Sequence, residues 1–195
     1  MGVISRLRGI AEQWGSSIVP LLSRISGNPN HYTIAGVIAA LGAVLAAYKG
    51  LALASVALIL LSGVMDAVDG LVARHMGRAS RAGALVDSVS DRISDTLYHV
   101  ALALLGVDPL PLILSLSASI ITPYLRARGE ALGVRMAGVG LVERQERVLI
   151  VAFIGLMAGY NPYYASMTTW ILAAVAWITV AQRWLHIYRI LSLKG

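Results

Sequence analysis

The stretch from Asp66 to Asp91 reads DAVDGLVARHMGRASRAGALVDSVSD, with a short basic link between two apolar segments. Asp66 and Asp69 lie in the first segment, and Asp87 and Asp91 lie in the second. The whole chain has only ten acidic residues, so four in one stretch is a marked concentration. Acidic side chains are costly beside membrane-spanning segments and usually serve a function there. The stretch therefore predicts a functional site.

The composition predicts an all-α, polytopic membrane protein. Of the 195 residues, 57% are hydrophobic and 13% are charged, whereas soluble domains have about 25% charged residues. The apolar residues occur in runs close to the roughly 20 residues that cross a bilayer as a helix. The chain has no cysteine, which excludes disulfides and thiolate metal sites.

We expect an N-terminal amphipathic helix followed by six transmembrane helices. Residues 1–26 place apolar side chains at helical spacing with arginines between them, which favours a helix in the membrane interface. A loosely ordered leader is the alternative, and no compact apolar run indicates a cleavable signal peptide. Residues 27–195 are expected to form one membrane domain. The expected spans are residues 32–48, 51–73, 82–105, 110–132, 143–159 and 164–191.

Basic residues predict the orientation of the chain in the cell membrane. Of sixteen Lys and Arg residues, only Lys49 falls on the side of the turns that follow the first, third and fifth spans. Cytoplasmic loops carry an excess of Lys and Arg, so both termini and the four aspartates are expected on the cytoplasmic side. The same rule accounts for the net charge of +6 without a nucleic acid as a partner.

The spacing of the aspartates predicts a site for hard divalent cations. Asp66 and Asp69 are three residues apart, and Asp87 and Asp91 are four apart, so each pair shares one helix face. Four converging carboxylates would repel one another without cations, and oxygen ligands suit Mg²⁺ or Mn²⁺. For any single aspartate, the alternative is a helix cap or an ion pair, for example with Arg74.

Three further residues lie close to the aspartates in the sequence. Asp95 follows Asp91 by one helical turn, and either extends the carboxylate set or pairs with Arg92 or a neighbouring helix. Gly70 and Gly83 leave the backbone open to a close ligand, with helix packing as the alternative.

The aspartates belong to a longer pattern that resembles the signature of the CDP-alcohol phosphotransferases. The pattern reads Asp66-x-x-Asp69-Gly70-x-x-Ala73-Arg74, then eight residues, then Gly83-x-x-x-Asp87-x-x-x-Asp91. Every fixed position of the signature is filled, and six spans are also what the family leads one to expect. The resemblance implies an enzyme that joins a CDP-activated lipid or alcohol to an acceptor hydroxyl, with release of CMP and with divalent metal.

The resemblance also implies a role for each matching residue. Two metal ions would be held by Asp66, Asp69 and Asp87, with Asp91 near the second ion. Asp91 would be the general base that takes the proton of the acceptor hydroxyl. The CDP nucleotide would lie against Asp69, Gly70, Ala73, Arg74 and Gly83, and against Asn30 and Thr33 of a Pro-Asn-x-x-Thr segment.

A second basic region indicates the kind of acceptor. Residues 124–147 read YLRARGEALGVRMAGVGLVERQER and contain five arginines. Contact with lipid headgroups is one explanation, and an anionic acceptor is the other, because arginine forks bind phosphate well. The layout R-A-R-x-E-x-x-G followed by E-R-x-E-R resembles the phosphatidylinositol-phosphate synthase branch of the family. The acceptor phosphate would then be bound by Arg126, Arg144, Arg147 and Arg183.

These expectations combine into one hypothesis with named rivals. The enzyme would transfer a phosphatidyl-type group from CDP-diacylglycerol or CDP-archaeol to inositol 1-phosphate. It would contact membrane lipids, and the family resemblance suggests that it forms a homodimer. Glycerol 3-phosphate, serine or another inositol compound are the rival acceptors. From other classes, the rivals are an ion or metal transporter that uses the aspartates as its path, and a non-catalytic scaffold.

Overall fold

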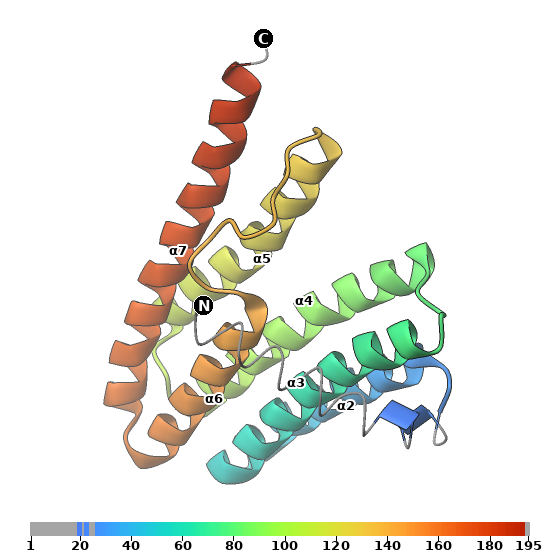
Figure 1. Cartoon of the computed structure of the whole chain (residues 1–195). Coiled ribbons are helices and arrows are strands. Elements are labelled where there is room, and N and C mark those ends of the chain that lie inside the picture. Colours follow the sequence, from blue (N-terminus) through green and yellow to red (C-terminus); the bar gives the residue numbers. More distant parts are fainter. Residues whose placement is uncertain (1–18, 21, 24–25, 194–195) are drawn as a thin grey trace, which may run out of the picture.

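Six helices that alternate in direction make up the part of the chain that the structure describes (Figure 1). The structure is a computed structural model that describes residues 19–20, 22–23 and 26–193. No strand occurs among these residues, as predicted, whereas most of the amphipathic helix expected over residues 1–26 lies outside them. The helices are α2 (Pro29–Tyr48), α3 (Ala52–His75), α4 (Arg81–Leu104), α5 (Pro109–Ala131), α6 (Arg144–Tyr160) and α7 (Pro162–Ser192).

Each expected span coincides with one helix to within three residues at either end. Four of the helices, α2, α3, α5 and α7, are long and apolar enough to cross a membrane. Helix α4 carries five charged residues in 24, and α6 has only 17 residues and begins with charged side chains. The chain is thus a multi-pass membrane protein, and the crossing of the membrane by α4 and α6 stays a prediction.

Local side-chain contacts explain where the helices near the aspartates begin. The side chain of Asn28 accepts a hydrogen bond from the Asn30 amide, 3.1 Å away, and caps α2. Ser80 caps α4 in the same way through the Gly83 amide, at 3.0 Å. A reciprocal capping box between Glu143 and Glu146 starts α6. Such caps satisfy amide groups that have no partner inside the helix.

The helices form two groups that α6 joins (Figure 1). Helix α2 packs against α3 and α4, α5 packs against α7, and α6 contacts both α3 and α7. Glycines permit the close approach of α6 to α3, because a Cβ on Gly155 would lie 2.7 Å from Val56 Cγ2. A Cβ on Gly159 would likewise lie 2.7 Å from the Cβ of Ala52. Small residues commonly allow such packing between membrane helices.

A chain of buried hydrogen bonds ties α4, α3 and α2 together. The Tyr98 hydroxyl donates to Ser62 Oγ at 2.7 Å, and the Ser62 hydroxyl donates to the carbonyl of Gly36 at 2.7 Å. Both side chains are almost completely buried. Because hydrogen bonds between membrane helices contribute about 0.6–2 kcal/mol each, this chain helps to fix the register of the helices that carry the aspartates.

The alternation of the helices gathers the polar residues at one end of the bundle. The N-termini of α2, α4 and α6 and the C-termini of α3, α5 and α7 lie at this end. Three helix N-termini with partial positive charge and three C-termini with partial negative charge thus share this end, and these charges largely offset one another. The charged side chains at this end therefore decide which ligand it can bind.

Candidate active site

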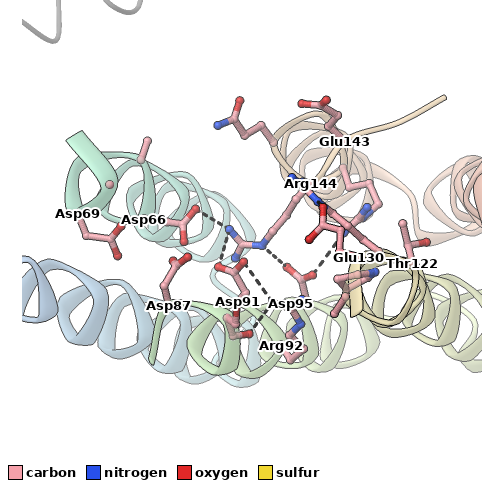
Figure 2. Close-up of a pocket in the computed structure, with 18 of the residues that line it drawn as sticks. Asp66, Asp69, Asp87, Asp91, Arg92, Asp95, Thr122, Glu130, Glu143 and Arg144 are labelled. Atoms are coloured by element: carbon pink, nitrogen blue, oxygen red, sulfur yellow. Dashed lines mark hydrogen bonds and ion pairs between the residues drawn. The ribbon is translucent and has the colours of Figure 1, made fainter. Parts of the chain in front are cut away.

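Three of the predicted metal ligands meet between α3 and α4. Asp66 and Asp69 extend from the last turns of α3, and Asp87 extends from the second turn of α4 (Figure 2). One carboxylate oxygen of each lies within 4.8 Å of the others. The two pairs of aspartates therefore face each other as the spacing predicted, with one member of the second pair outside the group.

A hydrogen bond from α2 fixes one of these carboxylates. Thr33 Oγ1 donates to Asp69 Oδ2 at 2.6 Å, and both side chains are buried. The bond occupies one oxygen of Asp69 and leaves the other for a second partner. Thr33, which the sequence assigned to the nucleotide site, thus also orients a predicted metal ligand.

Asp91 lies one turn further along α4 and faces the arginines (Figure 2). Its Oδ1 lies 3.0 Å from Arg144 Nη1, and its Oδ2 lies 3.4 Å from Arg92 Nη1. Oδ1 is buried without a hydrogen-bond partner among the described residues, because the contact with Arg144 is an ion pair of poor hydrogen-bond geometry. Asp91 is thus separate from the three-carboxylate group but beside it.

Arg144 lies at the centre of the ion pairs, where its guanidinium contacts three aspartates (Figure 2). Its Nη1 lies 2.6 Å from Asp66 Oδ2 and 3.0 Å from Asp91 Oδ1. Its Nε lies 3.3 Å from Asp95 Oδ1. The sequence assigned Arg144 to the acceptor phosphate, and the structure places it on the border between the carboxylates and the other arginines.

The remaining predicted acceptor arginines are held in different ways. Arg183 donates from Nε to the Val139 carbonyl at 3.0 Å and from Nη1 to the Thr122 carbonyl at 2.9 Å. The buried Arg147 lies 3.7 Å from Asp95. Arg126 instead pairs with Glu130 on its own helix, and this pair is half exposed.

A cavity of about 560 Å³ brings these arginines and the aspartates together. Its wall includes all four predicted acceptor arginines. It also includes five carboxylates from α3 and α4, namely Asp66, Asp69, Asp87, Asp91 and Asp95. The cavity can thus hold a ligand that carries its own phosphate next to a group of carboxylates.

A second cavity, of about 510 Å³, is lined by two of these carboxylates, Asp69 and Asp87. Every residue that the sequence assigned to the nucleotide lines it, namely Asn30, Thr33, Asp69, Gly70, Ala73, Arg74 and Gly83. Four residues, Asp69, Gly70, Arg74 and Asp87, line both cavities. The two cavities therefore meet at the carboxylate group.

Sequence reasoning left out several residues that the structure places in the two cavities. Arg78, in the link between α3 and α4, lines the second cavity and donates to the Gly27 carbonyl at 2.8 Å. Thr122 lines the first cavity and supplies the carbonyl that holds Arg183. The sequence left the role of Asp95 open, and in the structure Asp95 pairs with Arg144 and Arg147 of the neighbouring helix α6. The only sequence feature that pointed to Asp95 was its four-residue spacing from Asp91.

The carboxylates fit a divalent metal by their chemistry and their geometry. Hard cations such as Mg²⁺ and Mn²⁺ prefer oxygen ligands, and three carboxylates converge here. The buried Oδ1 of Asp91, which has no hydrogen bond among the described residues, is a further acceptor beside them. A metal at this position would be reached from both cavities.

Comparisons with known proteins show the family of the chain. Residues 27–187 match the family model described as CDP-alcohol phosphatidyltransferase. The chain is 46% identical over 188 residues to the archaetidylinositol phosphate synthase of Aeropyrum pernix, covering 96% of this chain and 97% of the relative. It is 36% identical over 181 residues to the phosphatidylinositol phosphate synthase of Corynebacterium glutamicum, covering 85% and 80%.

Solved structures of a phosphatidylinositol phosphate synthase also resemble this chain in fold. The crystal structure of Mycobacterium tuberculosis phosphatidylinositol phosphate synthase with CDP-DAG bound superposes with a TM-score of 0.77 at 28% identity, covering 89% of this chain and 93% of that one. The structure of the same enzyme with manganese and citrate gives a TM-score of 0.77, covering 89% and 88%. The family resemblance read from the aspartate signature is confirmed, and the chain belongs to the CDP-alcohol phosphatidyltransferase family.

Proposed function

We propose that this enzyme transfers the phosphatidyl-type group of a CDP-lipid to inositol 1-phosphate and releases CMP. The observation that carries the proposal is the junction of the two cavities at one carboxylate group. One cavity has the residues of the nucleotide signature, and the other has four arginines for an acceptor phosphate. A donor and a phosphorylated acceptor bound in these cavities would meet at the carboxylates.

The names of the relatives support the lipid and the acceptor. Both the archaeal and the bacterial relatives are named as inositol phosphate synthases. The relative with 46% identity carries the name of an archaeal lipid, which favours CDP-archaeol over CDP-diacylglycerol as the donor. The distribution of basic residues further supports a cytoplasmic active site in the cell membrane.

In the proposed reaction, an inositol hydroxyl attacks the phosphorus that bears the lipid. A new bond forms between the inositol oxygen and this phosphorus, and the bond to the bridging oxygen of CMP breaks. Asp91 takes the hydroxyl proton, a role suited to its place in the acceptor cavity. Asp91 is absent from the wall of the nucleotide cavity, so a base at this position acts on the acceptor and not on the departing CMP.

The proposed metal ions, two by family resemblance, would be held by Asp66, Asp69 and Asp87, with Asp91 nearby. When bound, they would neutralise the pyrophosphate and stabilise the charge that develops on the departing CMP. Thr33 keeps one of the three carboxylates in place from α2. Arg74, which lines both cavities, would contact the donor phosphates.

The arginines of the first cavity would select an acceptor with a phosphate group. Arg183 is held by two backbone carbonyls, so its guanidinium is oriented before a ligand arrives. Arginine forks bind phosphate through paired hydrogen bonds, and preorganisation lowers the entropy lost on binding. Glycerol 3-phosphate shares the phosphate but lacks the inositol ring, and it is the second acceptor that the cavity could admit.

The choice of acceptor is tested directly by CMP release. Purified protein given CDP-archaeol and Mn²⁺ is expected to release CMP with inositol 1-phosphate at least tenfold faster than with glycerol 3-phosphate, serine or inositol. Chelation of the metal should stop the release, and added Mn²⁺ should restore it. A transporter would release no CMP with any acceptor, and fastest release with glycerol 3-phosphate would contradict the acceptor assignment.

Replacement of Asp91 tests the general base. Asp91→Asn keeps the size of the side chain but cannot accept the proton, so turnover should fall by about 10²–10⁴-fold. Binding of the CDP-lipid at saturating Mn²⁺, measured by isothermal titration calorimetry, should stay within about threefold, because Asp91 does not line the nucleotide cavity. Asp108→Asn, at the opposite end of the bundle where the side chain makes no cap, is the matched control. Wild-type turnover in Asp91→Asn would exclude the base role.

Replacement of Arg147 tests the acceptor site. Arg147→Ala should raise the KM for inositol 1-phosphate at least tenfold, because a buried arginine of the first cavity is lost. The KM for the CDP-lipid should change less than twofold, since Arg147 does not line the second cavity. Arg128→Ala removes an arginine that lines neither cavity and should change neither KM. Equal increases in both KM values for Arg147→Ala would argue against the assignment.

A further inference from the structure

Asp95 is a buried carboxylate that lies between the metal-binding aspartates and the acceptor arginines (Figure 2). Its exposed fraction is 7%. Its two oxygens contact different arginines of α6, with Oδ1 at 3.3 Å from Arg144 Nε and Oδ2 at 3.7 Å from Arg147 Nη2. The family signature ends at Asp91, so nothing in that pattern assigns Asp95 a role.

Two sets of carboxylates hold Arg144 from opposite edges of its guanidinium. Asp66 and Asp91 contact Nη1, at 2.6 and 3.0 Å, whereas Asp95 contacts Nε. Nε makes no hydrogen bond among the described residues, so its contact with Asp95 is electrostatic. The position of the guanidinium therefore depends on two opposing attractions, one to Asp66 and Asp91 and the other to Asp95.

The position of Arg144 affects metal binding because Arg144 and a metal ion would bind the same carboxylate, Asp66. Asp66 is one of the three grouped carboxylates, and its Oδ2 makes the shortest contact with Arg144. A positive guanidinium and a divalent cation repel each other, and both are attracted to Asp66. Asp95, one turn along α4 from Asp91, attracts the guanidinium through Nε and so lowers its competition with the metal at Asp66.

Asp95 is well placed for this role because its own position is fixed. It lies on α4, whose next turn is anchored by His99, with Nδ1 2.7 Å from the Asp95 carbonyl and Nε2 3.1 Å from Ser115 Oγ on α5. Tyr98, on the same turn, donates to Ser62 on α3. These contacts fix the turn of α4 from which the Asp95 side chain extends toward Arg144.

We propose that Asp95 is a positioning residue that acts through Arg144: it holds the guanidinium between the carboxylates and the other arginines of the first cavity, and so keeps Asp66 and Asp91 available to metal. Loss of its charge lets Arg144 move fully onto these two carboxylates. It also removes a negative charge near the site, and both effects weaken the binding of a divalent cation. The inference rests on the proposed metal site and extends it to a residue outside the signature.

Binding of Mn²⁺ alone tests the proposal without turnover. Free Mn²⁺ is measured by electron paramagnetic resonance in titrations of the purified full chain in detergent. Asp95→Asn should raise the Kd for Mn²⁺ about tenfold or more. Asp108→Asn, the same chemical change at the other end of the bundle, should leave the Kd unchanged. An unchanged Kd in Asp95→Asn would overturn the proposal.

A double substitution separates action through Arg144 from a simple loss of charge. In an Arg144→Gln background, Asp95→Asn should raise the Kd less than threefold, because the competing guanidinium is gone and only the smaller effect of the lost charge remains. The same tenfold increase in both backgrounds would show that Asp95 acts by charge alone and would overturn the positioning role.

A second variant covers the case in which Asp95→Asn fails to fold. A buried arginine left without a partner is destabilising, and Asp95→Asn leaves Arg147 in that state. Asp95→Asn combined with Arg147→Gln removes this unpaired charge and should still bind Mn²⁺ about tenfold more weakly than Arg147→Gln alone. Equal affinity in these two variants would contradict the proposal. If the unsubstituted protein bound no Mn²⁺, the proposed metal site itself would fail.

Discussion

The repulsion between aspartates at the ends of two apolar helices is the constraint on which this structure depends. Three carboxylates lie with oxygens within 4.8 Å of one another, where neighbouring negative charges raise the free energy of the site unless cations offset them. Within the described residues, the chain supplies Arg144 from α6 to this group, where it contacts Asp66. The same guanidinium also contacts Asp91 and Asp95, outside the group. We propose that metal ions supply the remaining positive charge, so the same constraint explains the fold at this end and the chemistry.

The arrangement of the helices places a cavity on each side of the proposed reaction, and both cavities include aspartates of the carboxylate group. Helices α2, α3 and α4 enclose the cavity with the nucleotide signature, and α5, α6 and α7 contribute the arginines of the other cavity. Asp69 and Asp87 lie on the wall that the two cavities share, and Asp66 is grouped with them. Arg144, at the start of α6, lines the first cavity and contacts Asp66, so the helix that joins the two groups of the bundle also reaches the carboxylate group.

The sequence predicted the helices and the grouping of Asp66, Asp69 and Asp87 well, because both depend on local patterns. Apolar runs, together with caps such as Asn28 and Ser80, determine where helices lie and begin. The sequence did not predict the pairing of Asp95 with Arg144 and Arg147, or the carbonyls of Thr122 and Val139 that hold Arg183. These contacts join residues far apart in the chain, and their geometry depends on how α6 and α7 pack.

The most direct test of this account is the position of Mn²⁺ in crystals grown with the metal, found by its anomalous scattering. The account predicts a peak at metal–oxygen bonding distance from Asp66, Asp69 and Asp87, at the junction of the two cavities, with Arg144 displaced from Asp66 Oδ2 or sharing that carboxylate with the metal. A peak bound elsewhere, with Arg144 still paired to all three of its aspartates and no metal at the junction, would contradict it.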